Sequence, residues 1–179
     1  MNKLKLTDRE WKSFYLPEIF SFKRGKRLIA KDRLSGNIAY YSASNTNNGV
    51  TDFISNPIFI EKNKIVVSTF CDAFFAQGEF TASDEMTLLN NKNLNKHNAI
   101  FICKMIQSNQ SKYAFGRKAF SDRLKRQIIM LPVDVQGNPD WQFMEDYIKQ
   151  IEQDKIKQLV GYYQAKLLDS QLKNDIGGG

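Results

Sequence analysis

The chain has 179 residues, of which 42% are hydrophobic, and it contains thirteen phenylalanines and seven tyrosines. This length suits one domain with an appended element, and the aromatic content supplies a real core, so extensive disorder is excluded. The formal net charge is +7 with a pI near 9.3, and no run reaches the roughly 20 apolar residues that a membrane span requires.

The first residues and the two cysteines of the chain indicate where in the cell the protein is expected. The segment "MNKLKLTDREWK" lacks the apolar stretch of a secretory signal peptide. Cys71 and Cys103 lie in apolar contexts and have no neighbouring His or Cys. We therefore expect a cytoplasmic protein with two buried free thiols and no disulfide.

Up to about residue 138 the pattern is typical of short strands joined by turns. The segment "PIFIEKNKIVVSTF", residues 57–70, reads as two strands hinged at "EKNK". The other strand-like segments are residues 11–22, broken by Pro17, and residues 37–44, 85–91 and 124–133. Between them, residues 95–115 have helical spacing, with Asn95 or Asn98 as the N-cap.

A long helix is predicted after the turn Gly137-Asn138-Pro139, with Asp140 as its N-cap. A helix of about 33 residues would span roughly 50 Å, more than the domain can cover. We expect part of it to project and form a coiled coil with a partner helix, although a helix folded back over its own domain is the alternative. Its apolar seam, the expected dimer or partner interface, comprises Trp141, Met144, Ile148, Ile151, Leu159, Tyr162 and Tyr163.

The predicted fold is therefore a mixed α/β globule followed by one long C-terminal helix. The expected division is a globular domain over residues 1–138, a spacer or dimerisation helix over residues 139–176, and a flexible tail over residues 177–179.

The basic residues are unevenly distributed, and most of the excess lies in residues 1–38 and 112–126. Such segregation favours a surface that faces a polyanion, although a merely solvated basic face has the same composition.

The sequence lacks the residues that several classes of enzyme require. No glycine-rich run ends in Lys-Ser/Thr, and no Cys/His spacing suits zinc. The only histidine, His97, is expected in an exposed loop. Glu10 and Lys12 could serve a nuclease, but the only upstream acid, Asp8, is too near. We expect no enzyme activity, metal or cofactor, which leaves binding.

Two regions combine the cations that neutralise phosphates with side chains that reach base edges. In the first, "SFKRGKRLIAKDR", Gly25 would let the backbone approach a phosphate, and the Asn-rich loop "SASNTNNGVTDF" follows. In the second, "SKYAFGRKAFSDRLKRQ", aromatics alternate with cations. An amphipathic helix that buries Phe115, Phe120 and Leu124 explains the second region equally well. The candidates for DNA contact are Lys23, Arg24, Lys26 and Arg27 for phosphates, Ser44, Asn45, Thr46 and Asn47 for base edges or loop shape, and Arg117, Lys118, Arg123 and Lys125 for either.

Four segments in order resemble a target-recognition domain of the DNA specificity subunit of type I restriction-modification systems. They are "W..FYLPEIFSFKRGKRL" from Trp11, "YYSASNTNNGV" from Tyr40, "VVSTFCDAFFAQGEFTASDEMTLL" from Val66 and "LKRQIIMLPVDVQGNPDWQFMEDYI" from Leu124. The resemblance implies a non-catalytic protein that binds double-stranded DNA and directs partner methyltransferase and restriction subunits. It also implies that S-adenosylmethionine, ATP and Mg²⁺ belong to those partners.

The chain departs from the family's pattern in two ways. The family's subunit has two such domains and two antiparallel helices, whereas this chain has one of each, so a half-size subunit that forms a homodimer through its helix is expected. The family often has glycines where this chain has "TFCDA" from Thr69, so a less tight backbone is expected there. The alternative function is a module that docks on a methyltransferase or restriction complex as a regulator or decoy without reading DNA.

Overall fold

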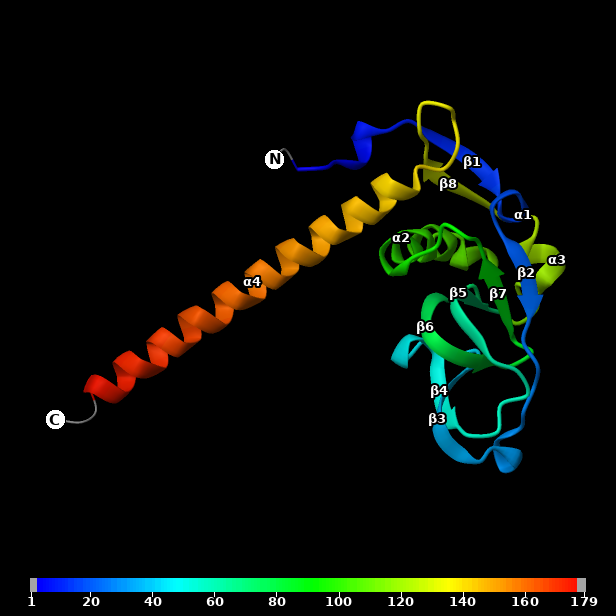
Figure 1. Ribbon diagram of the computed structural model, residues 1–179, viewed down its shortest axis with the longest axis horizontal. Coiled ribbons are helices and arrows are strands. Elements are labelled where there is room, and N and C mark those ends of the chain that lie inside the picture. The colour runs from blue at the N-terminus through cyan, green and yellow to red at the C-terminus, as the bar shows by residue number, and fades with distance from the viewer. Residues whose placement is uncertain (1–2, 177–179) are drawn as a thin grey trace.

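Two β-sheets organise the chain, which a computed structural model describes over residues 3–176 (Figure 1). The larger sheet has the strand order β2-β7-β5-β6-β3-β4, in which only β3 and β6 run parallel. Its strands are β2 (Ser21–Arg24), β3 (Ser35–Tyr41), β4 (Val50–Ile54), β5 (Glu61–Ser68), β6 (Ala73–Ala82) and β7 (Met86–Asn90). The second sheet is the antiparallel pair of β1 (Trp11–Tyr15) and β8 (Ile128–Pro132).

In the described part of the chain, four α-helices accompany the sheets. They are α1 (Leu16–Ile19), α2 (Lys96–Gln107), α3 (Ser121–Leu124) and α4 (Trp141–Ile176). Figure 1 shows the β1–β8 pair at the end of the globule where α4 begins, and β3 and β4 at the opposite end. The expectation of a mixed α/β globule followed by one long helix is confirmed, whereas the coiled coil stays a prediction.

The larger sheet separates two apolar clusters. Successive side chains of a strand point to opposite faces, so Ile65 and Val67 join the cluster beneath α1, α2 and α4, while Val66 joins the other. On β7, Leu89 and Leu88 divide in the same way. Because both faces are covered, these central strands lack the alternation of polar and apolar residues that marks a half-exposed strand.

The predicted hinge at "EKNK" is wrong, because residues 61–64 lie within the single strand β5, and residues 57–60 form no strand. The pairing of β5 with β6 shifts register between Lys62 and Lys64, and the φ of Asn63 is +52°. The Asn63 side-chain oxygen accepts a hydrogen bond of 2.8 Å from the Gly78 amide. The irregularity is therefore a bulge that leaves the strand continuous.

Helix α2 begins where the sequence predicts but ends earlier, at Gln107. The side chain of Asn95 accepts hydrogen bonds from the amides of His97 and Asn98 at 3.0 and 3.1 Å, which confirms the N-cap. His97 lies in the first turn of this helix, and its Nε2 is 2.9 Å from Oε2 of Glu152 on α4. The expectation of an exposed loop residue is therefore wrong, because His97 helps to join the two helices.

Helix α4 has 36 residues, which corresponds to about 54 Å at 1.5 Å per residue. The amide of Phe143 donates to the Asp140 carboxylate at 2.9 Å, which confirms the predicted N-cap. The helix leaves the globule and projects into solvent (Figure 1). The predicted projection is thus confirmed.

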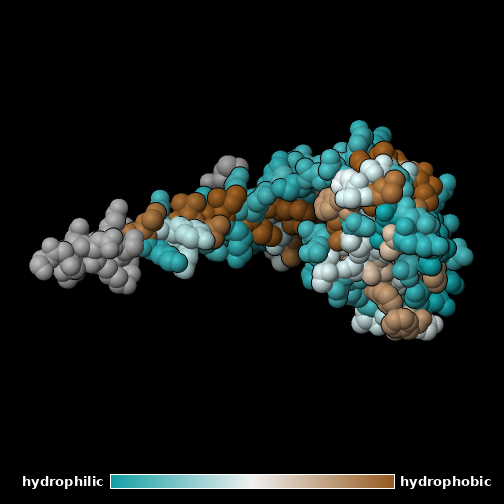
Figure 2. Space-filling model, turned by 90° about the horizontal axis from the view of Figure 1, so that it is seen from below, coloured by the Kyte–Doolittle hydropathy of each residue, from teal (hydrophilic) through white to brown (hydrophobic). Residues whose placement is uncertain are grey.

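The first turns of α4 pack on the globule itself. Met144 is completely buried in the first cluster, and Trp141 and Ile148 pack against its edge. The predicted role of Met144 in a partner interface is wrong, because its side chain is enclosed by its own domain. Farther along, up to residue 167, most side chains are exposed, and apolar groups lie along one side of the helix (Figure 2). The exposed apolar residues of this stretch include Ile151, Ile156, Leu159, Val160, Tyr162 and Tyr163. By helical spacing, Ile151, Leu159, Tyr162 and Tyr163 fall on one side of the helix.

Both cysteines are free and buried, as predicted. Burial raises the pKa of the Cys71 thiol to about 12. Cys71 has a φ of +67° in a tight turn, where the Ser68 amide donates to the Asp72 carbonyl at 2.8 Å. The expected looser backbone at this point is therefore not present, because Cys71 adopts the left-handed conformation that glycine usually provides.

Within residues 3–176, no helix combines the length and apolar character needed to span a membrane.

We expect Met144→Ala to lower the free energy of unfolding by about 2–5 kcal/mol, since it leaves a cavity where α4 meets the core. The matched control is Leu34→Ala, which removes a similar volume from a side chain that is 62% exposed and lies away from α4, and which should change stability by about 0.5 kcal/mol or less. Urea unfolding of both variants measures the difference, and equal effects would contradict this packing.

Gly25→Ala should destabilise the protein by about 1–3 kcal/mol or more. An ideal Cβ at Gly25 would lie 2.1 Å from the Ser83 carbonyl oxygen and 2.6 Å from that of Ala82. Gly116→Ala is the control, because a Cβ at Gly116 meets nothing within 4 Å. Thermal and urea unfolding compare the two, and a stable Gly25→Ala variant would show that the backbone can move apart there.

Candidate nucleic-acid interface

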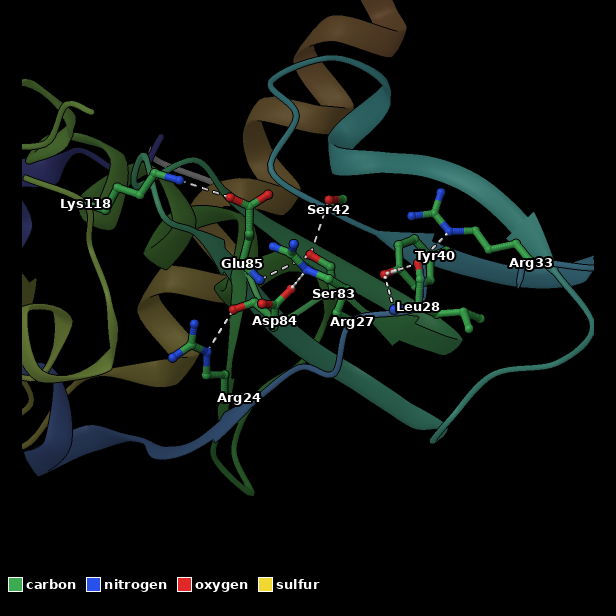
Figure 3. Close-up of polar contacts among 10 residues, drawn as sticks. All are labelled: Arg24, Arg27, Leu28, Arg33, Tyr40, Ser42, Ser83, Asp84, Glu85 and Lys118. Atoms are coloured by element: carbon green, nitrogen blue, oxygen red, sulfur yellow. Dashed lines mark hydrogen bonds and ion pairs between the residues drawn. The ribbon is translucent and has the colours of Figure 1, made fainter. Parts of the chain in front are cut away.

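The three groups of candidate DNA-contact residues, within 23–27, 44–47 and 117–125, belong to segments that meet around one turn, Ser83–Glu85, which joins β6 to β7 (Figure 3). The Ser83 amide donates to the Tyr41 carbonyl at 2.8 Å, and the Ser83 hydroxyl lies 3.2 Å from that of Ser42 at the start of the Asn-rich loop. The Met86 amide closes the turn by donating to the Ser83 carbonyl at 3.0 Å. One short turn thus fixes segments that are far apart in the sequence.

The segment after β2 runs against this turn through its backbone. The Gly25 amide donates to the Met86 carbonyl at 3.0 Å, and the Lys26 amide donates to the Ala82 carbonyl at 2.9 Å. The sequence suggested that Gly25 brings the backbone close to a phosphate. The structure shows instead that the missing Cβ makes room for the carbonyls of Ala82 and Ser83.

Arg24 at the end of β2 and Arg27 in the segment that follows both bond to Asp84 (Figure 3). Arg24 Nε donates to the Asp84 backbone carbonyl at 2.8 Å, and its guanidinium lies 5.0 Å from the centre of the Phe120 ring. Arg27 Nε donates to the Asp84 carboxylate at 2.8 Å, and this hydrogen bond raises the pKa of Arg27. The two side chains therefore help to hold the turn.

Lys118 joins the second predicted region to the same turn. Its ammonium lies 3.1 Å from the Glu85 carboxylate and 5.4 to 6.0 Å from the ring centres of Phe70, Phe115 and Phe120. The interaction attaches residues 113–126 to the turn by charge and by cation–π contact.

Lys23 is also paired, although with a different carboxylate. Its ammonium lies 2.6 Å from Glu61 and 4.9 Å from the centre of the Phe59 ring. The hydrogen bond from Lys23 lowers the pKa of Glu61. Lys23, Arg27 and Lys118 thus each have a carboxylate partner, which compensates part of their charge.

Other predicted cations have no carboxylate within 4 Å among the residues that the structure describes. These are Arg24, Lys26, Arg117, Arg123 and Lys125. Lys26 and Arg117 are exposed. Arg123 donates to the Lys118 carbonyl at 3.1 Å, and Lys125 lies 6.0 Å from the centre of the Phe22 ring. This subset can meet phosphates without displacing a carboxylate.

Arg117 and Arg123 line a recess of about 360 Å³ together with Lys112 and Arg126. Tyr113, Gln127 and Ile128 complete its lining, which includes no acidic residue. The Tyr113 hydroxyl lies 3.1 Å from the Gln127 side-chain oxygen, and burial raises the pKa of Tyr113. Four cations around one recess make an anion-binding environment.

In the Asn-rich loop, the side chains of Ser44 and Thr46 already have partners within the loop. The Ser44 and Thr46 hydroxyls are 3.0 Å apart, and the Thr46 amide donates to Ser44 Oγ at 3.2 Å. Asn47 and Asn48 have φ values of +48° and +52°, which agrees with their expected role in shaping the turn. Asn45 and Asn47 are both exposed and remain the loop's predicted candidates for a base edge.

Sequence reasoning missed Asp84 and Glu85, which receive Arg27 and Lys118. A signal was present, since these are the only acidic residues between Glu79 and Asp122 and they follow small residues between two strands. Among the described residues, no group of three His, Cys, Asp or Glu side chains could hold a metal ion.

The comparison with known proteins agrees on one family. A family model described as the type I restriction modification DNA specificity domain matches residues 8–160. The specificity subunit of a type II restriction enzyme from Heyndrickxia coagulans is 37% identical over 157 residues, which cover 82% of this chain and 45% of that subunit.

Solved structures share the fold. The S subunit of a type I restriction-modification system from M. genitalium matches with a TM-score of 0.60 and 18% identity, over 95% of this chain and 45% of that one. The HsdS subunit from Thermoanaerobacter tengcongensis matches with a TM-score of 0.55 and 16% identity, over 80% and 38%. The chain thus spans less than half the length of these relatives. The family match covers both the β6–β7 turn and the first part of α4, and the chain belongs to the type I restriction-modification DNA specificity family.

Proposed function

We propose that the chain binds double-stranded DNA through the surface around the β6–β7 turn and directs partner methyltransferase and restriction subunits to the bound site. The observation that carries this proposal is that some of the cations are paired with carboxylates and hold the loops, while others are left without such a partner. Arg27 and Lys118 fasten two segments to the turn, while their chain neighbours Lys26 and Arg117 are exposed and have no carboxylate within 4 Å among the described residues. Phosphates are the anions that such an array suits in a member of this family.

Under this proposal the unpaired cations hold phosphates and set the register of the protein on the duplex. Base identity would be read by side chains that present free hydrogen-bonding groups, of which Asn45 and Asn47 are the candidates in the Asn-rich loop. Ser44 and Thr46, which bond to each other, would position the loop.

The direct test is a gel shift of the chain on random duplex DNA at low and moderate salt, with and without a cognate methyltransferase. Binding that weakens steeply with salt supports the proposal. If the chain captures the methyltransferase but binds no duplex under either condition, DNA reading is excluded for this chain.

Replacement of Lys26 and Arg117 by alanine should weaken binding to all duplex sequences and reduce the salt slope by about one for each phosphate that is no longer neutralised. Lys62→Ala is the matched control, because Lys62 is an exposed cation already paired with Glu79 at 2.8 Å. The slope comes from affinities measured by fluorescence anisotropy over a salt series. An unchanged slope in the double variant would show that neither residue binds a phosphate.

We also propose that the exposed apolar side of α4 binds a second copy of the chain, helix against helix. Ile151, Leu159, Tyr162 and Tyr163 are 39 to 59% exposed along this side. Contact between such faces would bury apolar groups that the globule leaves in water.

Leu159→Glu with Tyr163→Glu should therefore abolish self-association while thermal unfolding of the globule stays unchanged. Lys157→Glu is the control, since helical spacing puts residue 157 on the opposite side from the apolar side chains. Sedimentation velocity over a concentration series measures the dimer. A wild-type chain that stays monomeric throughout the series would rule out the homodimer.

A further inference from the structure

Phe115 is unusual in its exposure. The residue is 85% exposed, although the sequence allowed it to be buried in an amphipathic helix. It lies at the tip of a turn in which the Arg117 amide donates to the Ala114 carbonyl at 2.8 Å and the Ala114 amide donates back at 3.4 Å. The amphipathic helix is not formed over this stretch, because α3 begins only at Ser121.

The ring is supported on one side and open on the other. Phe70 contacts it edge to face, with ring centres 5.3 Å apart. A Cβ at the neighbouring Gly116 would meet nothing within 4 Å, so the tip of the turn is unobstructed. A braced ring at the end of a hydrogen-bonded turn loses little conformational freedom when it is buried by a ligand.

The surroundings of the ring are cationic. Phe115 lines a surface recess with Lys118, Phe120, Arg123 and Arg126, in which Asp122 is the only acid. Arg123 and Arg126 also line the neighbouring recess with Lys112 and Arg117, which includes no acid. The two recesses share Arg123 and Arg126, so the exposed ring of Phe115 lies next to a place that suits a phosphate.

A ligand for this surface must be a polyanion that also offers flat apolar faces. A protein partner could cover Phe115, but it would need a dense run of acids to match the cations beside it. Nucleic acid provides both features in its regular repeat of phosphates and bases. Apolar side chains that insert between base steps unstack them and kink the duplex.

We propose that Phe115 inserts at a base step of bound duplex DNA, while Lys112, Arg117, Arg123 and Arg126 hold the adjoining phosphates. The proposal rests on the proposed function, because it specifies how the same surface engages DNA. It assigns to Phe115 a distortion of the duplex that is separate from phosphate binding and from hydrogen bonding to base edges.

The test begins with a duplex selected from a random pool for binding to the wild-type chain. One set of copies carries 2-aminopurine at successive positions, and another carries a donor and an acceptor dye at its ends. We expect the wild-type chain to raise 2-aminopurine fluorescence at one step and to shorten the end-to-end distance. Phe115→Ala should remove both signals and lower the affinity about tenfold or more, with the salt slope unchanged because the substitution alters no charge.

Phe53→Ala is the matched control, since Phe53 on β4 is also an exposed phenylalanine, at 55%. Phe115→Trp should keep the fluorescence signal and the bend, because a large ring is retained. If Phe115→Ala unstacks and bends the duplex as the wild type does, the insertion is overturned while DNA binding stands. If that variant keeps both signals but no longer captures the methyltransferase, Phe115 is a protein contact and the insertion is likewise overturned. If the wild-type chain binds no duplex at all, the proposed function itself fails.

Discussion

The close approach of the segment after β2 to the β6–β7 turn determines where the basic side chains lie. Two backbone hydrogen bonds, from Gly25 to Met86 and from Lys26 to Ala82, hold that segment in place. They can form only because Gly25 has no Cβ. Arg24, Arg27 and Lys118 then reach the same short turn from two directions, so cations that are far apart in the sequence gather at one place.

The acidic residues of the turn give the cations two different tasks. Arg27 and Lys118 are engaged by Asp84 and Glu85, and ion pairs that keep contact with solvent, as these do, contribute little net stability. Their value is positional, because they orient loops that also present unpaired neighbours such as Lys26. The formal net charge of +7 does not distinguish these tasks, because a paired and an unpaired cation contribute equally to it.

What the sequence could predict is what short-range chemistry encodes. Asn95 and Asp140 were recognisable as caps because each bonds an amide two or three residues away. Strand β6 was missed because its burial depends on neighbours on both faces rather than on alternation. Met144 is an ordinary apolar position of the helical seam, and only the placement of α4 against the core reveals that it is enclosed. In the same way, no local pattern indicates that Gly25 faces Ser83.

The hydrogen bonds at Gly25 and Lys26 join uncharged groups, so the shape of this surface does not depend on the ion pairs that lie on it. Salt screens the pairs that Arg27 and Lys118 make, as it screens any attraction to phosphates. Amide-to-carbonyl bonds carry no net charge, so they persist at an ionic strength that weakens the ion pairs. The scaffold that presents the cations therefore keeps its form in a solution in which their attraction has faded, and a fall in salt restores the attraction without any refolding of the loop.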